Sequence, residues 1–218
     1  MMRYGIPEYR LPRDVLDAEI ARIRELGVTF VQNHKVTDLL DEQHAGHFDA
    51  VFVAIGAHLS KRIDIPTMDA GRIVDAVSFL RDVASGDRPL IGRRVAVYGA
   101  GNTAMDAART ARRLGAEESI VVYRRTQDQM PAHAEEHDEA VREGVKMNWL
   151  RTINQFDEGH MQVEIMELDE NGKARGTGKF ETLEADTVIL ALGQEADSGF
   201  LRSIPGMSFD GDTVNVNP

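Results

Sequence analysis

The chain has 218 residues, 42% of them hydrophobic and 28% charged, which is ordinary for a soluble globular protein of one large or two small domains. Its net charge of −11 argues against nucleic acid or an anionic membrane as the main partner, and no run is long enough for a transmembrane helix, so we expect a cytoplasmic protein. Cysteine is absent, which excludes disulfides, thiol catalysis and cysteine-held iron–sulfur clusters within these residues.

The beginning of the chain predicts a mixture of helix and strand. Two prolines make residues 3–12 irregular, and Asp14 is placed to cap a helix that ends at Gly27. A short strand is expected at residues 28–31. The run 49–57 is apolar and closes on small residues, which predicts a buried strand that ends in a tight turn.

A linker and then a glycine-rich turn follow. Residues 61–90 contain several prolines and glycines, so we expect a linker with one short helix at 74–83. The β-branched run at 95–98 predicts a strand. It leads into a G-x-G-x-x-A turn and an alanine-rich segment; the turn consists of Gly99, Ala100, Gly101, Asn102, Thr103 and Ala104.

This turn has the chemistry of a dinucleotide pyrophosphate site. Gly99 permits a tight turn, Gly101 lets the backbone approach the phosphates, and Ala104 keeps the following helix close to the sheet. The free N–H groups and the dipole of that helix attract an anion. We therefore expect a bound dinucleotide here, with Asn102 and Thr103 also at the pyrophosphate.

The next strand indicates which dinucleotide is bound. Residues 119–123 are apolar and end in Arg124 and Arg125, where an acidic residue would instead receive a ribose 2′-hydroxyl. Two guanidinium groups suit a 2′-phosphate better than a neutral diol, which favours NADP(H) over NAD(H). The simpler alternative is a pair of surface arginines flanking a buried strand.

The last third of the chain completes an α/β fold. Pro131 is placed in the first turn of a helix that Gly144 ends. An antiparallel hairpin is expected at 160–182, with its turn at Asn171-Gly172, and the apolar run 187–194 predicts another buried strand with Gly193 at its exit. The predicted fold class is a Rossmann-like FAD/NAD(P)-binding fold: a parallel sheet flanked by helices, with an antiparallel hairpin insertion.

Several ordered motifs carry a family resemblance. They are residues 4–12 (YGIPEYRLP), 99–106 (GAGNTAMD), 123–126 (YRRT) and 130–132 (MPA). In them the chain resembles the small subunit of NADPH-dependent glutamate synthase and related electron-entry flavoproteins. The resemblance implies an NADPH domain inserted into an FAD domain, with hydride passing from NADPH to FAD and electrons leaving through iron–sulfur clusters held outside this chain.

The resemblance also implies boundaries and further cofactor residues. Ile55 and Gly56, and likewise Gly193, match the turns where such chains cross between domains. The implied division is a partial FAD-type domain at 1–60, the linker at 61–90, the NADPH domain at 91–194 and a return segment of the FAD-type domain at 195–218. The chain has no first G-x-G-x-x-G for FAD, so we expect the central part of a longer protein that is inactive alone. The implied partner is an iron–sulfur or large-subunit electron acceptor, and a homodimer stays open.

Three other interpretations compete. His133, Glu136 and His137 fit H-x-x-E-H, an inverted zinc-protease pattern. A self-contained NADP-dependent dehydrogenase is a second alternative, although no tyrosine is followed four residues later by lysine. The third is a non-catalytic NADP(H)-binding module that senses or docks. We assign no catalytic residue from the sequence.

Overall fold

The computed structural model describes residues 1–61, 63, 65–66, 72–157, 159–211 and 213–216. The chain forms two compact units: Met1–Leu16 with Ser60–Gly193, and Asp17–Leu59 with Gln194–Pro218. Residues 1–16 thus group with the unit that holds the parallel sheet, whereas the prediction places them with 17–60. Part of the predicted linker, at 62, 64 and 67–71, lies outside the described residues.

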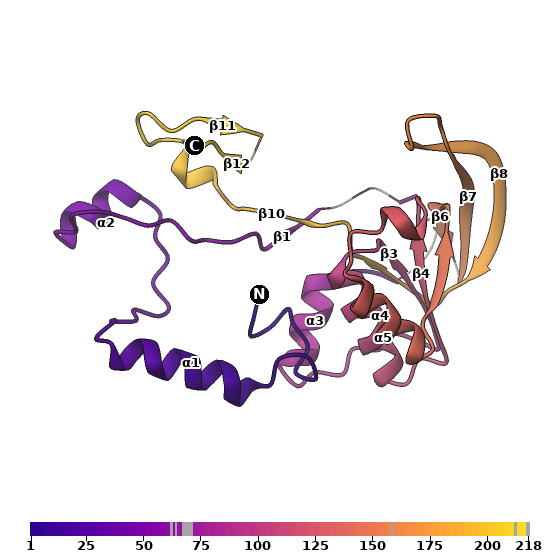
Figure 1. Ribbon diagram of the computed structural model, residues 1–218, viewed down its shortest axis with the longest axis horizontal. Helices are drawn as coiled ribbons and strands as arrows, with labels where there is room; N and C mark the ends of the chain where they lie inside the picture. Colours follow the sequence, from indigo (N-terminus) through magenta and orange to yellow (C-terminus); the bar gives the residue numbers. More distant parts are fainter. Residues whose placement is uncertain (62, 64, 67–71, 158, 212, 217–218) are drawn as a thin grey trace. The chain divides into compact units, whose positions relative to one another are not determined.

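A parallel sheet forms the centre of the first unit (Figure 1). Its strand order is β2–β9–β3–β4–β5, and each neighbouring pair is parallel. The strands are β2 (Arg72–Asp75), β3 (Arg94–Tyr98), β4 (Glu118–Tyr123), β5 (Lys146–Trp149) and β9 (Thr187–Leu190). All of β9 is buried, as are the last four residues of β3, which is the pattern of strands covered on both faces.

The two faces of the sheet contribute to two separate cores. Three helices cover one face: α3 (Ala76–Ala84), α4 (Asn102–Arg113) and α5 (Ala134–Arg142). Val95 and Val97 of β3 pack with these helices, and the alternate residues Ala96 and Tyr98 belong to the core on the other face. Successive strand residues point to opposite faces, so one short strand serves both cores.

Helix α4 lies close against the sheet because its buried side is made of small residues. Ala104, Ala107, Ala108 and Ala111 are all fully buried, and the helix packs on β3 and β4. Gly115 follows the helix with φ +105°, the left-handed conformation expected where the chain turns back toward β4. The strand–turn–helix unit predicted from the sequence is confirmed.

The second face is covered by a three-stranded antiparallel sheet. Its strands are β6 (Arg151–Asp157), β7 (His160–Leu168) and β8 (Ala174–Glu184), in the order β6–β7–β8. The predicted hairpin is β7–β8, and Gly172 lies in its turn with φ +72°. Strand β6 was not predicted; Ile153 and Phe156 of β6 are buried in the core that this sheet shares with β3 and β9.

The second unit has little regular structure. Helix α1 (Arg13–Glu25) begins in the first unit and continues in the second from Asp17, and the short strand β1 (Leu59–Ser60), which pairs with β10 (Gln194–Glu195), likewise spans the boundary. The other elements of the second unit are α2 (Leu39–Ala45), the 3-10 turn η2 (Gly199–Leu201), and the hairpin β11 (Phe209–Asp210) with β12 (Thr213–Val214). The predicted helix before Gly27 is confirmed, although Asp14 lies within its first turn rather than at its cap.

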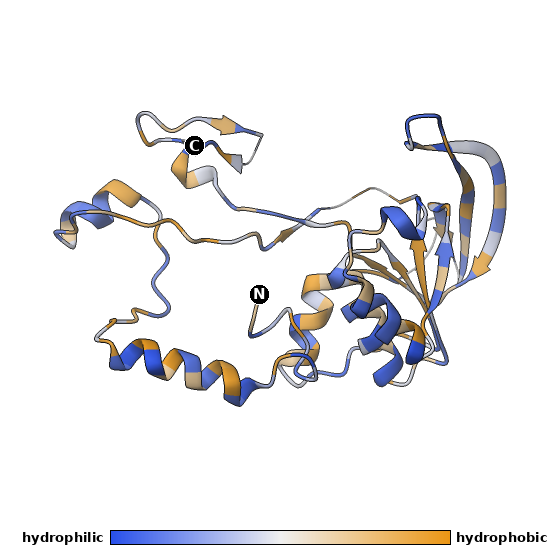
Figure 2. Ribbon diagram, in the orientation of Figure 1, coloured by the Kyte–Doolittle hydropathy of each residue, from blue (hydrophilic) through white to orange (hydrophobic). Residues whose placement is uncertain are grey.

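Two predicted strands of this unit are wrong. The structure describes residues 28–31 and 49–57 without helix or strand, and Phe52 is 92% exposed. Figure 2 shows apolar residues along the extended segment between α2 and β1. An apolar run becomes a buried strand only where a neighbouring strand pairs with it and another layer covers it, and the described part of this unit supplies neither for these residues.

One further boundary differs from the prediction. The segment expected to be a helix at 74–83 begins as β2 and becomes α3 only at Ala76, where the Asp75 carboxylate caps the helix by accepting from the N–H groups of Val77 and Ser78. None of the helices in the described part of the chain is both long and apolar enough to cross a membrane.

Candidate functional site

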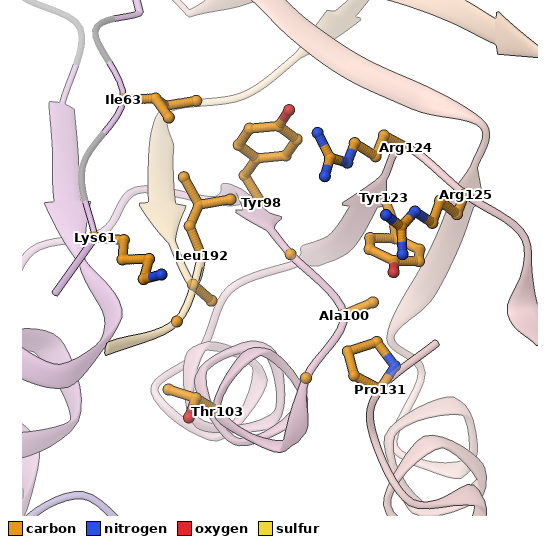
Figure 3. A pocket seen from close by; sticks show the side chains of 14 residues that line it. Lys61, Ile63, Tyr98, Ala100, Thr103, Tyr123, Arg124, Arg125, Pro131 and Leu192 are labelled. Atoms are coloured by element: carbon orange, nitrogen blue, oxygen red, sulfur yellow. The ribbon is translucent and has the colours of Figure 1, made fainter. Parts of the chain in front are cut away.

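A pocket of about 470 Å³ opens in the first unit where β3, β4 and β9 end and α4 begins (Figure 3). Parallel sheets bind ligands at the carboxyl ends of their strands, beside the helices that follow. The residues that line the pocket are Lys61, Ile63, Tyr98, Gly99, Ala100, Gly101, Thr103, Tyr123, Arg124, Arg125, Pro131, Ala191, Leu192 and Gly193.

The two glycines of the turn meet different surroundings. Gly99 has φ +132°, and a Cβ on it would collide with the backbone carbonyl of Ala191 at the end of β9. At Gly101 the nearest atom to such a Cβ is Cγ of Pro131, at 4.0 Å, so this glycine borders open space. The first glycine therefore permits the chain path, and the second leaves room for a ligand.

Helix α4 presents its amino terminus to the pocket. Gly101 is its N-cap residue, and no described side chain caps the helix there. The N–H groups of the first turn thus lack a side-chain acceptor, while the helix dipole makes this end attractive to an anion. Thr103, in the same first turn, lines the pocket.

Arg124 and Arg125 follow β4 and line the other side of the pocket. Neither forms an ion pair with a carboxylate within the described ranges, whereas Arg94, Arg109 and Arg151 all do. Nε of Arg125 is buried and has no hydrogen-bond partner among the described residues. Nor does any aspartate or glutamate line this pocket in the described structure. The two positive charges are thus left available to an anion.

Several lining residues were not predicted from the sequence. Tyr98 and Tyr123 stand at the ends of their strands, and their hydroxyl groups are engaged: Tyr98 with Thr152 Oγ1, and Tyr123 as donor to the carbonyl of Gln129 at 3.0 Å. The last position of β3 and of β4 was the available signal, because strand ends converge on this site. Leu192, two residues after β9, shared that signal, whereas Lys61 had none, since it precedes the strands and lies in the predicted linker.

Of the remaining predicted cofactor residues, Gly193 lines the pocket and the others do not. The side chain of Asn102 accepts a hydrogen bond from the N–H of His133 at 3.0 Å, and Ala104 is buried in the core beneath the turn. Gly193 lines the pocket with φ +101°. Ile55 and Gly56 belong to the other unit and are not among the lining residues.

The residues of the H-x-x-E-H motif contact neighbouring protein groups. His137 is buried, and its ring stacks on Trp149 with the ring centres 6.0 Å apart, while His133 is exposed at the N-cap of α5. Glu136 pairs with Arg10 and Arg109. No group of three metal-binding side chains occurs in the part of the chain that the structure describes.

A charge network joins the N-terminal segment to α4 and α5, behind the pocket. Arg10 pairs with Asp106 at 2.7 Å and also with Glu136. Burial raises the pKa of Asp106, and the bond to Arg10 opposes that effect. Tyr9 lies under the guanidinium groups of Arg109 and Arg113, and burial raises the pKa of its hydroxyl to about 12. These contacts give the polar residues on this side of α4 a structural role.

Comparison with known proteins agrees with this geometry. The pattern of the family "Pyridine nucleotide-disulphide oxidoreductase" matches residues 11–217. The chain is 40% identical to the NADP(+)-dependent formate dehydrogenase subunit beta of Moorella thermoacetica, over 100% of this chain and 33% of that protein. It is 32% identical to the glutamate synthase [NADPH] small chain of Halomonas elongata, over 88% of this chain and 45% of that protein. The predicted resemblance to glutamate synthase small subunits is confirmed.

A solved structure shows the same fold. FprA of Mycobacterium tuberculosis, in complex with NADPH, superposes with a TM-score of 0.73 at 18% identity, over 96% of this chain and 63% of that one. The chain spans about a third of the length of the formate dehydrogenase subunit. The predicted α/β fold class, a parallel sheet with an antiparallel insertion, is confirmed by the sheets and by this neighbour. The chain belongs to the pyridine nucleotide-disulphide oxidoreductase family.

Proposed function

We propose that the pocket is an NADP(H) site. The observation that carries the proposal is the pair Arg124 and Arg125, which has no carboxylate partner in the described structure and stands across the pocket from the glycine turn. The forked guanidinium group of an arginine matches a phosphate, and Nε of Arg125 is buried without a partner among the described residues.

The residues present fit the two charged parts of this cofactor. The uncapped start of α4, with Gly101 and Thr103, supplies backbone N–H groups and open space for a pyrophosphate, while Gly99 permits the turn and donates its own N–H to the carbonyl of Val122. Arg124 and Arg125 supply donors for a 2′-phosphate, and the buried, unpartnered Nε of Arg125 is a donor that such a ligand would satisfy. Gly193 borders the pocket at the end that follows β9.

For the whole protein we propose an NADPH-dependent flavin oxidoreductase of the glutamate synthase small-chain type. Transfer of hydride from nicotinamide to FAD is the chemistry that the two cofactors supply when bound, while the protein binds and orients them. Similar proteins are named as a subunit and as a small chain, which supports a partner chain. The proposal makes that partner an electron acceptor that carries iron–sulfur centres. The proposal places the protein in the cytoplasm.

The lining of the pocket also supports transfer to a separate acceptor. Within the described residues no histidine and no carboxylate lines it, and both tyrosine hydroxyl groups are hydrogen-bonded to protein groups, so Lys61 is the remaining lining side chain, besides the arginines, that titrates. A dehydrogenase that acts on a small substrate by itself needs a group that takes up or donates the substrate's proton. The self-contained dehydrogenase is therefore the less well supported alternative.

The test is calorimetric titration of the chain with NADP⁺ and with NAD⁺. Replacing both arginines (Arg124→Ala with Arg125→Ala) is expected to weaken NADP⁺ binding by about 2–4 kcal/mol, because charge-assisted hydrogen bonds to the 2′-phosphate are lost. NAD⁺ binding should barely change. Arg142→Ala, an exposed arginine on α5, is the matched control. Equal losses for both dinucleotides would contradict the assignment.

A further inference from the structure

The two arginines are carried by a segment whose position depends on distant contacts. Residues 124–130 leave the end of β4 and contain one short 3-10 turn, η1 (Gln127–Gln129). The Arg124 and Arg125 side chains are not anchored by any described ion pair, so the backbone of this segment decides where their charges lie. Besides local bonds within the 3-10 turn and one from Tyr123, two contacts to this segment come from the antiparallel sheet and the residue that leads into it.

The first of these contacts lies at Gln129. Its side-chain Nε2 donates to the backbone carbonyl of Gly172, at 2.8 Å, in the turn between β7 and β8. The backbone carbonyl of Gln129 accepts from the hydroxyl of Tyr123, a residue that lines the pocket. Oε1 of Gln129 is buried with no partner among the described residues. The bond to the carbonyl of Gly172 is therefore the one described hydrogen bond of the Gln129 side-chain amide.

The turn that receives Gln129 is itself fixed. Oδ1 of Asp169 accepts from the N–H groups of Asn171 and Lys173, at 3.0 and 2.9 Å, and Oδ2 accepts from Nε of Arg175 at 2.7 Å. These bonds, that of Lys173 foremost, hold the pKa of Asp169 below its usual range. Gly172 adopts φ +72°, which few other residues tolerate. The carbonyl of Gly172 is thus presented in one orientation.

A second contact holds the other end of the segment. The N–H of Leu150, which precedes β6, donates to the carbonyl of Arg125 at 3.1 Å. The carbonyl of Leu150 in turn accepts from the N–H of Met166 in β7, at 2.9 Å. Leu150 has φ +56°, an uncommon conformation for a leucine, so the chain is held there by its surroundings. The same hairpin therefore supports the segment at Arg125 and at Gln129.

We propose that Gln129 and the β7–β8 turn position Arg124 and Arg125 and thereby set the preference for a dinucleotide with a 2′-phosphate. Gln129 touches no cofactor; it acts through Arg124 and Arg125 by fixing the backbone between β4 and the hairpin. This inference rests on the proposed NADP(H) site. It assigns the antiparallel insertion a role in cofactor selection, besides covering the sheet.

The test compares Gln129→Ala with Gln127→Ala, an exposed glutamine on the same turn whose side chain makes no hydrogen bond within the described part. Loss of one buried hydrogen bond is expected to weaken NADP⁺ binding about 3- to 10-fold in Gln129→Ala and to leave NAD⁺ within about twofold. Gln127→Ala should bind both like the wild type. Asp169→Ala, which loosens the turn without touching Gln129, should shift the NADP⁺ to NAD⁺ ratio in the same direction.

A second measurement needs no ligand. Amide hydrogen exchange of the segment around η1 should be faster in Gln129→Ala than in Gln127→Ala, because the segment opens more often once its anchor is lost. Equal weakening of both dinucleotides, or an unchanged ratio with unchanged exchange, overturns the inference alone. A wild-type chain with no preference for NADP⁺ overturns the proposed function, and this inference with it.

Discussion

At the scale of single residues, the glycine turn shows how one motif combines two different requirements. Gly99 is fixed by the fold, because its φ is +132° and the carbonyl of Ala191 occupies the place of a Cβ. Gly101 is not constrained in this way, since Cγ of Pro131, at 4.0 Å, is the nearest described atom beyond its chain neighbours and α4 to a Cβ built there. The missing side chain at Gly101 therefore leaves room for a ligand and is not required by the fold.

We therefore expect opposite outcomes for alanine at the two positions. Gly99→Ala should lower the free energy of unfolding by several kcal/mol, roughly 2–4, because backbone must move in a buried turn. Gly101→Ala should unfold like the wild type yet bind NADP⁺ and NAD⁺ at least about tenfold more weakly, since the added methyl group occupies pyrophosphate space. Urea unfolding and calorimetry measure the two effects. A Gly101→Ala variant with normal affinity would place the pyrophosphate elsewhere.

Glu143 makes the stability of the network behind the pocket depend on pH. It accepts bonds from Arg113 at 2.7 and 3.0 Å and from Arg109 at 2.8 and 3.1 Å. The bond from Arg113 is the main cause that lowers the pKa of Glu143 from 4.5 to about 2. A carboxyl group whose pKa is lower in the folded chain stabilises it above the ordinary value of 4.5, and this stabilisation is lost as the pH falls toward about 2.

Glu143→Gln is expected to lower the free energy of unfolding at pH 7 by about 1–2 kcal/mol. The loss stays below the full value of the pKa shift because the carboxylate is at the rim of the network, where water screens it. The difference from the wild type should shrink between pH 4.5 and about 2. Glu135→Gln, at an exposed position of α5, is the control. A constant difference across this range would mean that Glu143 does not titrate as proposed.

At the scale of elements, the N-terminal segment stabilises α4 through a nearly buried ion pair. The Asp106 side chain is 5% exposed and that of Arg10 is 22% exposed. Removing Arg10 leaves the nearly buried Asp106 carboxylate without this partner, which costs more than removing both, while Glu136 keeps its ion pair with Arg109. The YGIPEYRLP motif therefore has a structural use within this chain, as an anchor on the helix that begins at the pocket.

A double-mutant cycle measures this coupling. Arg10→Leu should lower the free energy of unfolding by about 3 kcal/mol, and Asp106→Leu added to it should restore part of the loss. The coupling energy should therefore be well above 0.5 kcal/mol, the usual limit for independent sites. Strictly additive losses, measured by urea unfolding, would show that the ion pair does not hold the segment.

Local patterns account for the elements that were predicted. Strands β3, β4 and β9 are largely apolar runs with glycine or arginine within three residues of their ends, so the strands and the site were predicted together. Strand β6 pairs with the adjacent strand β7, but its mixed run RTINQFD gave no apolar signal, and the Gln129–Gly172 contact joins residues 43 positions apart. The run 49–57 has the apolar pattern of a strand. Whether a strand forms depends on hydrogen bonding to a neighbouring strand, which the sequence of one segment does not reveal.

At the scale of the whole molecule, the two units differ in how well their apolar residues are covered. The first unit buries the valines of β3 completely, whereas Phe52, Leu26 and Val31 in the second are 92%, 83% and 73% exposed. A cluster of exposed apolar residues promotes binding of apolar dyes and association with other surfaces, whereas a single one is ordinary.

Phe52→Ser is accordingly expected to reduce the fluorescence of an apolar dye and any self-association seen in sedimentation. Leu90→Ser, at a leucine of the first unit that is 80% exposed, should change neither. NADP⁺ affinity should stay the same in both variants, because every residue that lines the pocket belongs to the first unit. Unchanged dye binding in Phe52→Ser would show that the apolar segment is covered in solution.

The most direct test of the central claim is a calorimetric comparison of two small ligands, adenosine 2′,5′-bisphosphate and adenosine 5′-monophosphate. They differ only in the 2′-phosphate, so the comparison isolates the group assigned to Arg124 and Arg125. The account predicts that the bisphosphate binds at least about tenfold more tightly, and that the advantage disappears when both arginines are replaced by alanine. Equal affinity of the wild-type chain for the two ligands would contradict it.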